Sequence, residues 1–298
     1  MKGVKELKAR IKSVANIRKV TSTMELVAAA KMRKLQERAL QSRPYSNAIR
    51  SMVGEVGRHV SGGAFALLHE PAKVERELMI VVGADKGLCG AFNANLSRAA
   101  FNHLKARRAE GTTCEVYCFG KRVEKFFMKI EAPILGALEE KVEKVDYRRV
   151  ATAVRAATKD FIEGKYQRVS LVYTWFRSPT VFEPRVDTLL PIPLPKPEAK
   201  GSGAAAAAVA VELDYIMEPS PVEILDRLLP KSVEMKLYAA VLESLASEFA
   251  ARRIAMKNAT DAADDMNVDL TMEYNKARQS GITGELLEIV AGAAALTG

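Results

Sequence analysis

Residues 231–280 read KSVEMKLYAAVLESLASEFAARRIAMKNATDAADDMNVDLTMEYNKARQS, and these fifty consecutive positions contain neither glycine nor proline. Helices of globular proteins average about 11 to 12 residues, whereas one helix of this length would be a rod of about 75 Å. Its apolar residues recur at spacings of four and form one slowly drifting stripe, made of Val233, Leu237, Val241, Leu245 and Phe249. Such a stripe requires a partner helix.

The opposite end of the chain supplies that partner, a helix that we predict from Lys2 to about Val56. Its apolar residues are spaced by three and four, namely Val4, Leu7, Ile11, Val14, Ile17, Val20, Met24 and Val27. The two helices most economically pair as an antiparallel coiled coil. If the alanines at 28–30 face those at 246–251, residue 1 lies opposite about residue 278 and the last ~20 residues project alone. Pro44 should kink the first helix or mark a boundary.

The segment between the helices alternates strand and helix patterns. Apolar runs predict strands at 77–83, 114–120 and 168–176, and helices are expected from an Asn93 or Asn95 cap to Ala109, from about Lys121, and over 147–162. The fold class is therefore mixed, a long antiparallel coiled coil with an inserted α/β, Rossmann-like domain. We expect coiled-coil helices at 1–60 and 219–298, and the inserted domain at 61–218.

The end of the inserted domain changes composition. Residues 191–208 are rich first in proline and then in glycine, serine and alanine, which predicts a flexible linker or loop. A further strand is expected at 211–217, followed by a short helix, VEILDRLL, that ends at Pro230.

The charge is concentrated at the amino end. The whole chain carries +9, and residues 1–58 hold fourteen Lys and Arg against four Glu. A basic helix fits nucleic acid, an anionic membrane surface or a protein with acidic loops. The sequence lacks a run of 18 uncharged apolar residues and a secretory or transit pattern, which favours a cytosolic chain that can dock on a membrane-bound partner.

Patterns for bond chemistry are weak. The loop GADKGLCG follows a strand, but Lys86 is followed by Gly87 and Leu88 where a phosphate-binding loop needs Ser or Thr, so a structural turn is favoured. Three cysteines and three histidines show no metal-ligand spacing, and buried thiols are favoured over a disulfide. We expect no catalytic, metal-binding or nucleotide-binding residues and no cofactor.

The carboxyl end differs from an ordinary helix end. After Glu288 the sequence IVAGAAALTG carries no charge, although basic residues usually stabilise the last turn of a helix. A narrow apolar tip suits a sleeve supplied by another protein. A frayed terminus is the alternative.

Several segments resemble the gamma subunit of the rotary F-type ATP synthase: residues 282–296 (ITGELLEIVAGAAAL), 274–279 (YNKARQ), 21–34 (TSTMELVAAAKMRK), 42–45 (SRPY) and 85–93 (DKGLCGAFN). The resemblance implies a central shaft that couples proton-driven rotation of a membrane ring to conformational change in the catalytic ring. The implied partners are three alpha and three beta subunits, the epsilon subunit and the c-ring. It also implies a non-catalytic subunit peripheral to the membrane, on the cytoplasmic face of a bacterial inner membrane or, alternatively, the matrix side of a mitochondrial one.

The resemblance also assigns residues by position. Arg278 and Gln279 are expected to contact a beta-subunit loop. Acidic lever segments of the beta subunits are expected near Lys19, Met24, Lys31 and Arg33. The tip that turns in an apolar bearing comprises Ile282, Thr283, Glu285, Leu286, Ile289, Val290 and Ala293.

Two other functions remain open at this point. A basic coiled coil that binds nucleic acid explains the charged amino end but not the chargeless tip, and the base-stacking patterns of such proteins are missing. A nucleotide-using enzyme built on the inserted domain would bind stoichiometric nucleotide as an isolated chain, and we predict none.

Overall fold

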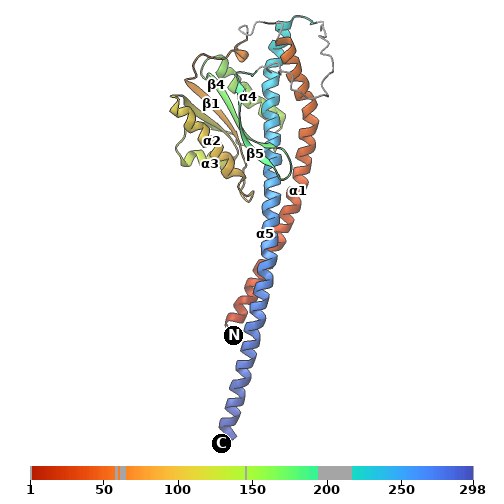
Figure 1. The fold of residues 1–298 in the computed structure, drawn as a ribbon, viewed down its shortest axis with the longest axis vertical. Coiled ribbons are helices and arrows are strands. Elements are labelled where there is room, and N and C mark those ends of the chain that lie inside the picture. The colour runs from red at the N-terminus through yellow and green to blue at the C-terminus, as the bar shows by residue number, and fades with distance from the viewer. Residues whose placement is uncertain (1, 58–59, 61–64, 145, 194–216, 298) are drawn as a thin grey trace, which may run out of the picture. The chain divides into compact units, whose positions relative to one another are not determined.

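The computed structural model describes residues 2–57, 60, 65–144, 146–193 and 217–297 (Figure 1). The chain divides into two compact units. The first, the shaft unit, contains residues 1–30, 88–90 and 251–298. The second, the α/β unit, contains residues 31–87 and 91–250. Two long helices, α1 (Lys2–Val56) and α5 (Pro221–Thr297), contribute to both units.

In the shaft unit, α1 and α5 run antiparallel. Arg18 forms an ion pair with Asp264, and the Thr260 hydroxyl lies 2.8 Å from the Thr21 hydroxyl, so rising numbers on α1 meet falling numbers on α5. Val14, Ala28, Met256 and Ala263 are buried here. These pairs place the start of α1 opposite roughly residue 280, within a few residues of the predicted register.

The α/β unit contains a five-stranded sheet in the order β3-β2-β1-β4-β5. The strands are β1 (Arg76–Val82), β2 (Thr113–Phe119), β3 (Ile134–Ala137), β4 (Arg168–Phe176) and β5 (Phe182–Leu190), and all pairings are parallel except that of β5 with β4. The central position of β1 explains its continuous apolar run, because both of its faces are covered.

Helices cover the two faces of this sheet. On one face, α2 (Phe92–Ala109) and α3 (Lys121–Lys129) lie side by side (Figure 1) and pack Leu96, Leu104 and Phe127 against β1 and β2. On the other face, α4 (Tyr147–Ile162) lines a cavity with Leu78 and Ile80 of β1. Two short 3₁₀ turns, η3 (Ala66–Leu68) and η4 (Val142–Lys144), complete the described elements.

Most predicted elements are confirmed. The structure places α1, α4 and β4 at their expected bounds and shifts β1 and β2 by one residue. The expected strand at 211–217 lies outside the described residues except for Met217, and so does the predicted linker at 191–208 except for residues 191–193. The domain boundaries at 60 and 218 stay a prediction.

Two strands were missed, and two local expectations were wrong. Strands β3 and β5 were not predicted. Helix α2 begins after Ala91, so Asn93 and Asn95 lie inside it and neither is its cap; the side-chain oxygen of Asn93 accepts from the amide of Ala84 (3.3 Å). Helix α1 runs to Val56 with Pro44 inside it, as predicted, whereas α5 begins at Pro221 and continues through Pro230, where a short helix was expected to end. The cost of Pro230 in a helix interior is offset by burial of Leu225, Leu229 and Val233 around it.

A polar cluster fastens α4 to α5 inside the α/β unit. The carboxylate of Glu234 accepts from Arg155 Nε (2.9 Å) and from the hydroxyl of Tyr147, whose oxygen also accepts from Lys231. Burial raises the pKa of Glu234, but hydrogen bonds from Tyr147 and Arg155 and the charge of Lys231 outweigh burial, so the net pKa is lowered. Glu234 is therefore ionised and paired at neutral pH.

Candidate partner-contact sites and the ligand crevice of the sheet

The carboxyl ends of β1 and β4 are the place where a doubly wound sheet ordinarily binds a ligand. The strand order reverses beside β1, because β2 and β4 flank it on opposite sides, and ligands of such sheets bind at this switch point. Here α5 covers both strand ends. The hydroxyl of Ser244 donates to the carbonyl of Val82 (2.8 Å), and the hydroxyl of Ser247 donates to the carbonyl of Thr174 (3.3 Å).

The loop after β1 is also used for structure. The carboxylate of Asp85 accepts from the amides of Val142 (2.9 Å) and Lys121 (3.3 Å), so it holds the beginnings of η4 and α3. A side chain on Gly120, whose φ is +108°, would lie 2.7 Å from the Gly83 carbonyl oxygen, so the two turns are packed backbone to backbone. This geometry agrees with the structural turn predicted from GADKGLCG.

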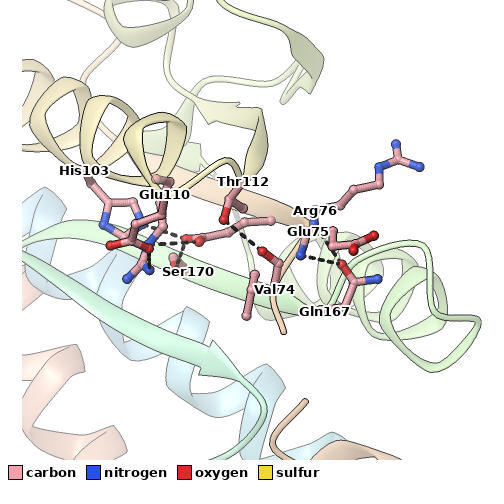
Figure 2. A network of polar contacts seen from close by, with 10 residues as sticks. Val74, Glu75, Arg76, His103, Glu110, Thr112, Gln167 and Ser170 are labelled. Atoms are coloured by element: carbon pink, nitrogen blue, oxygen red, sulfur yellow. Dashed lines mark hydrogen bonds and ion pairs between the residues drawn. The ribbon is translucent and has the colours of Figure 1, made fainter. Parts of the chain in front are cut away.

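A buried polar group centred on Glu77 lies at the opposite edge of the sheet, near the amino ends of β1 and β4. The buried carboxylate of Glu77 on β1 accepts from the hydroxyl of Ser170 on β4 and contacts His103 Nε2 (2.6 Å) and Arg107 Nε (3.3 Å) of α2. Figure 2 shows His103 and Ser170 approaching from different elements, with Thr112 and Gln167 binding the backbone of Val74 and Arg76 nearby. Serine and histidine both contact the carboxylate, whereas a nucleophilic triad requires the histidine to lie between serine and carboxylate.

The buried charge of Glu77 is stabilised by its neighbours. Burial raises the pKa of Glu77, but hydrogen bonds from His103 and Ser170 and the charges of His103 and Arg107 outweigh burial and lower the pKa below its usual 4.5. Glu77 thus fastens α2 to the sheet. No residue spacing predicts this group, because its four members come from three separate elements.

The cysteines show no reactive character. All three are buried thiols outside any disulfide, and burial raises the pKa of Cys114 and of Cys118 to about 12. Within the described ranges, histidine, cysteine and acidic side chains form no group that could hold a metal ion. None of the helices in those ranges is long and apolar enough to cross a bilayer.

The carboxyl end of α5, in the shaft unit, presents apolar side chains to solvent. Ile282, Leu286, Ile289 and Val290 are between 50% and 67% exposed, and their spacing places them along one stripe. Leu287, which was not among the predicted tip residues, is 65% exposed beside that stripe. The tip is therefore apolar over more than one face, as the interior of a sleeve would require.

Other predicted contact residues have different surroundings. Arg278, Gln279, Thr283, Glu285 and Ala293 are exposed on α5, and the Thr283 hydroxyl donates to the Gln279 carbonyl of its own helix (3.0 Å).

The predicted lever contacts on α1 also differ among themselves. Lys19 and Arg33 are exposed, and Met24 is half-buried. Lys31 forms an ion pair with Glu143 and lies 5.3 Å from the ring centre of Phe249, so its charge is already paired within the α/β unit.

These observations define a class of protein, in which long paired helices carry a Rossmann-like domain whose ligand crevice is closed by a helix. A family model described as ATP synthase matches residues 3–296. The ATP synthase gamma chain of Chloroflexus aurantiacus (strain J-10-fl) is 37% identical over 299 residues, covering 100% of both chains, and that of Glaesserella parasuis is 38% identical over 99% of this chain and 100% of its own.

Solved structures show the same fold. A chain of the Euglena gracilis mitochondrial ATP synthase structure, described as OSCP/F1/c-ring, matches with a TM-score of 0.67 at 17% identity, covering 99% of this chain and 94% of that one. A chain of the Tetrahymena thermophila central stalk and c-ring structure matches with a TM-score of 0.57 at 18% identity, covering 80% of this chain and 99% of that one. The chain belongs to the ATP synthase gamma-chain family. Gamma chains are rotary subunits and not themselves catalytic.

Proposed function

We propose that this chain is the rotating central shaft of an F-type ATP synthase. Rotation of a membrane ring by proton flow turns the α/β unit, and α1 and α5 carry that rotation into a ring of three alpha and three beta subunits. The asymmetric shaft then biases the three catalytic sites toward different affinities for ADP, phosphate and ATP. The epsilon subunit and the c-ring are the proposed partners of the α/β unit.

The apolar end of α5 carries this proposal. A helix end that exposes Ile282, Leu286, Ile289 and Val290 by half or more leaves a large apolar area in water, and burying that area inside a partner would be favourable. An apolar sleeve suits rotation because apolar contacts are non-directional, so the tip can turn without breaking specific bonds. We assign this bearing role to residues 282–293.

Polar contacts are proposed on α5 just before the apolar tip, and also on α1. Arg278 and Gln279 are exposed and would meet a beta-subunit loop. Lys19 and Arg33 are exposed on the basic helix and would face acidic lever segments, with Met24 between them in sequence. Exposed ion pairs contribute little free energy individually, so we assign these residues to steering and register.

The organisms of the relatives bear on the proposed location. The curated gamma chains that match at 37–38% identity come from bacteria, whereas the mitochondrial structures match at 17–18%. We therefore place the subunit at the cytoplasmic face of a bacterial inner membrane, peripheral to it. The matrix side of a mitochondrial inner membrane is the alternative.

Deletion of residues 289–298 tests the bearing. We expect the truncated chain to keep the circular dichroism and urea midpoint of its α/β unit, because the deleted residues belong to the other unit, while the assembled complex loses coupled ATP synthesis or assembles poorly. Synthesis and rotation rates equal to those of the full chain would contradict a working bearing.

Purification of the native complex, followed by identification of its subunits, tests the proposed partners.

A further inference from the structure

The crossing of α5 over the ends of β1 and β4, within the α/β unit, is held by two serines. Ser244 and Ser247 are 2% and 0% exposed, and each donates its hydroxyl proton to a carbonyl of the sheet, at Val82 and Thr174 respectively. Val82 is the last residue of β1, and Thr174 lies near the end of β4. The helix is thus bonded to the two strands that flank the switch point.

A serine inside a helix usually behaves differently. Its hydroxyl ordinarily bonds to a carbonyl of the preceding turn of the same helix, as Ser232 of α5 does with Leu229 (2.8 Å). Ser244 and Ser247 instead reach across to another element. Because they are three residues apart, they lie on the same face of the helix, the face that meets the sheet.

The neighbouring contacts are apolar. Val241 and Leu245 are buried on α5 beside the serines. Apolar packing attracts without a fixed direction, whereas hydrogen bonds weaken steeply when the donor turns away from the acceptor. The two serine bonds therefore fix the rotation of α5 about its own axis and its register along the sheet, which apolar packing specifies less sharply.

We propose that Ser244 and Ser247 are the positioning residues through which torque passes from the α/β unit into α5. The inference rests on the proposed function of the chain as a rotating shaft. The crevice in which this fold ordinarily holds a ligand here holds the shaft helix. When the domain is turned, the strand-end carbonyls of Val82 and Thr174 pull on the two hydroxyls, and α5 turns with the sheet.

The test uses the assembled complex with its catalytic ring fixed to a surface. A probe is attached through a cysteine introduced at Lys105, an exposed position on α2, and its angular variance is recorded while the motor is stalled. Variance measures the torsional compliance between the α/β unit and the ring. We expect S244A/S247A to raise it about twofold, because directional bonds are replaced by non-directional contact.

Ser232→Ala is the matched control, since it removes a hydroxyl of the same helix that, among the residues described, bonds to Leu229 within that helix. It should leave the variance at the wild-type value, and Ser244→Thr, which keeps a hydroxyl, should give a lower variance than Ser244→Ala. Loss of stability alone would lower the amount of assembled complex without changing the variance of the complexes that form. If the double variant fails to assemble, the single variants S244A and S247A are judged by the same criteria.

Three results would overturn the proposal: an unchanged variance in the double variant, an equal rise in S232A, or no difference between S244T and S244A. A wild-type complex that hydrolyses ATP without any rotation of the probe would instead overturn the proposed function itself. The two failures are therefore distinguishable in one experiment.

Discussion

One helix, α5, passes through two contrasting surroundings. In the α/β unit its stripe residues Val233, Leu237, Val241, Leu245 and Phe249 are each less than 5% exposed. In the shaft unit, residues 282–290 of the same helix carry an equally apolar stripe that is half or more exposed. Identical helix periodicity therefore has two meanings. Where the chain supplies its own cover the stripe stabilises the fold, and where it does not the stripe is available for a partner.

The largest expected difference compares one leucine from each region. Leu237→Ala should lower the free energy of unfolding of the α/β unit by about 3 kcal/mol, because it opens a cavity at a fully buried position. Leu286→Ala should change it by less than about 0.5 kcal/mol, because that side chain is 57% exposed. Urea denaturation of the free chain measures both. Equal losses of unfolding free energy in the two variants would contradict the contrast between the covered and the exposed stripe.

Glu77 tests the polar counterpart of this burial. Glu77→Gln removes the charge that balances Arg107 and His103 and should cost about 3 kcal/mol, as breaking a buried pair does. Glu110→Gln, which removes an exposed partner of the same Arg107, is the control and should cost far less. A small loss of unfolding free energy in E77Q would show that the Glu77 carboxylate contributes little to the attachment of α2 to the sheet.

The same carboxylate gives a pH dependence. The folded pKa of Glu77 is lowered below 4.5, so its contribution to stability is fully present above about pH 4.5 and is lost as the pH falls through the lowered folded value. Urea midpoints measured between pH 7 and pH 3 should therefore decline less steeply in E77Q than in the wild type. Parallel curves would contradict the assigned direction.

Much of this contrast is readable from the sequence, and the misses have physical causes. The spacing of Leu237 and Leu286 predicts both stripes, and an uninterrupted apolar run predicts β1. Strand β5 is an edge strand with Pro184 inside it, and a proline within a run argues against a strand. The alternation of Phe182, Val186 and Leu190 with charged residues was the signal that could have found it. Strand β3 has only four residues.

The polar attachments were beyond sequence reasoning for a different reason. Ser244 and Ser247 resemble any helix serines until the sheet carbonyls beside them are known, and Glu77 gives no hint of His103 or Arg107 across 26 and 30 positions. Proline caused the opposite kind of error, a predicted helix end that the structure does not have. Pro230 predicts the end of a short helix, yet α5 continues through it, because tertiary packing outweighs a local propensity.

A smaller effect is expected in the uncovered region of α5. Arg278→Glu should lower the ATPase rate of the assembled complex about fivefold, equivalent to roughly 1 kcal/mol, because an exposed cation that meets a partner loop would become an anion. The control is Lys276→Glu, two positions away on another face of the helix. Circular dichroism of the free chain should not change in either variant, and equal ATPase losses would contradict a specific contact.

The smallest effect concerns the pair Arg18 and Asp264, which joins α1 to α5 in the shaft unit with both side chains about half exposed. A double-mutant cycle with Arg18→Ala and Asp264→Ala should give a coupling free energy below about 0.5 kcal/mol, decreasing with added salt. A coupling of several kcal/mol would show that the shaft depends on surface charge and not on its buried stripe.

Rotation of a single complex tests the central claim most directly. With the catalytic ring immobilised and a probe on a cysteine at position 105, ATP should drive rotation of the probe in one direction; the three native cysteines are buried and should not compete for the label. A complex that hydrolyses ATP while the probe on this chain stays still would contradict the assignment of the chain as the shaft.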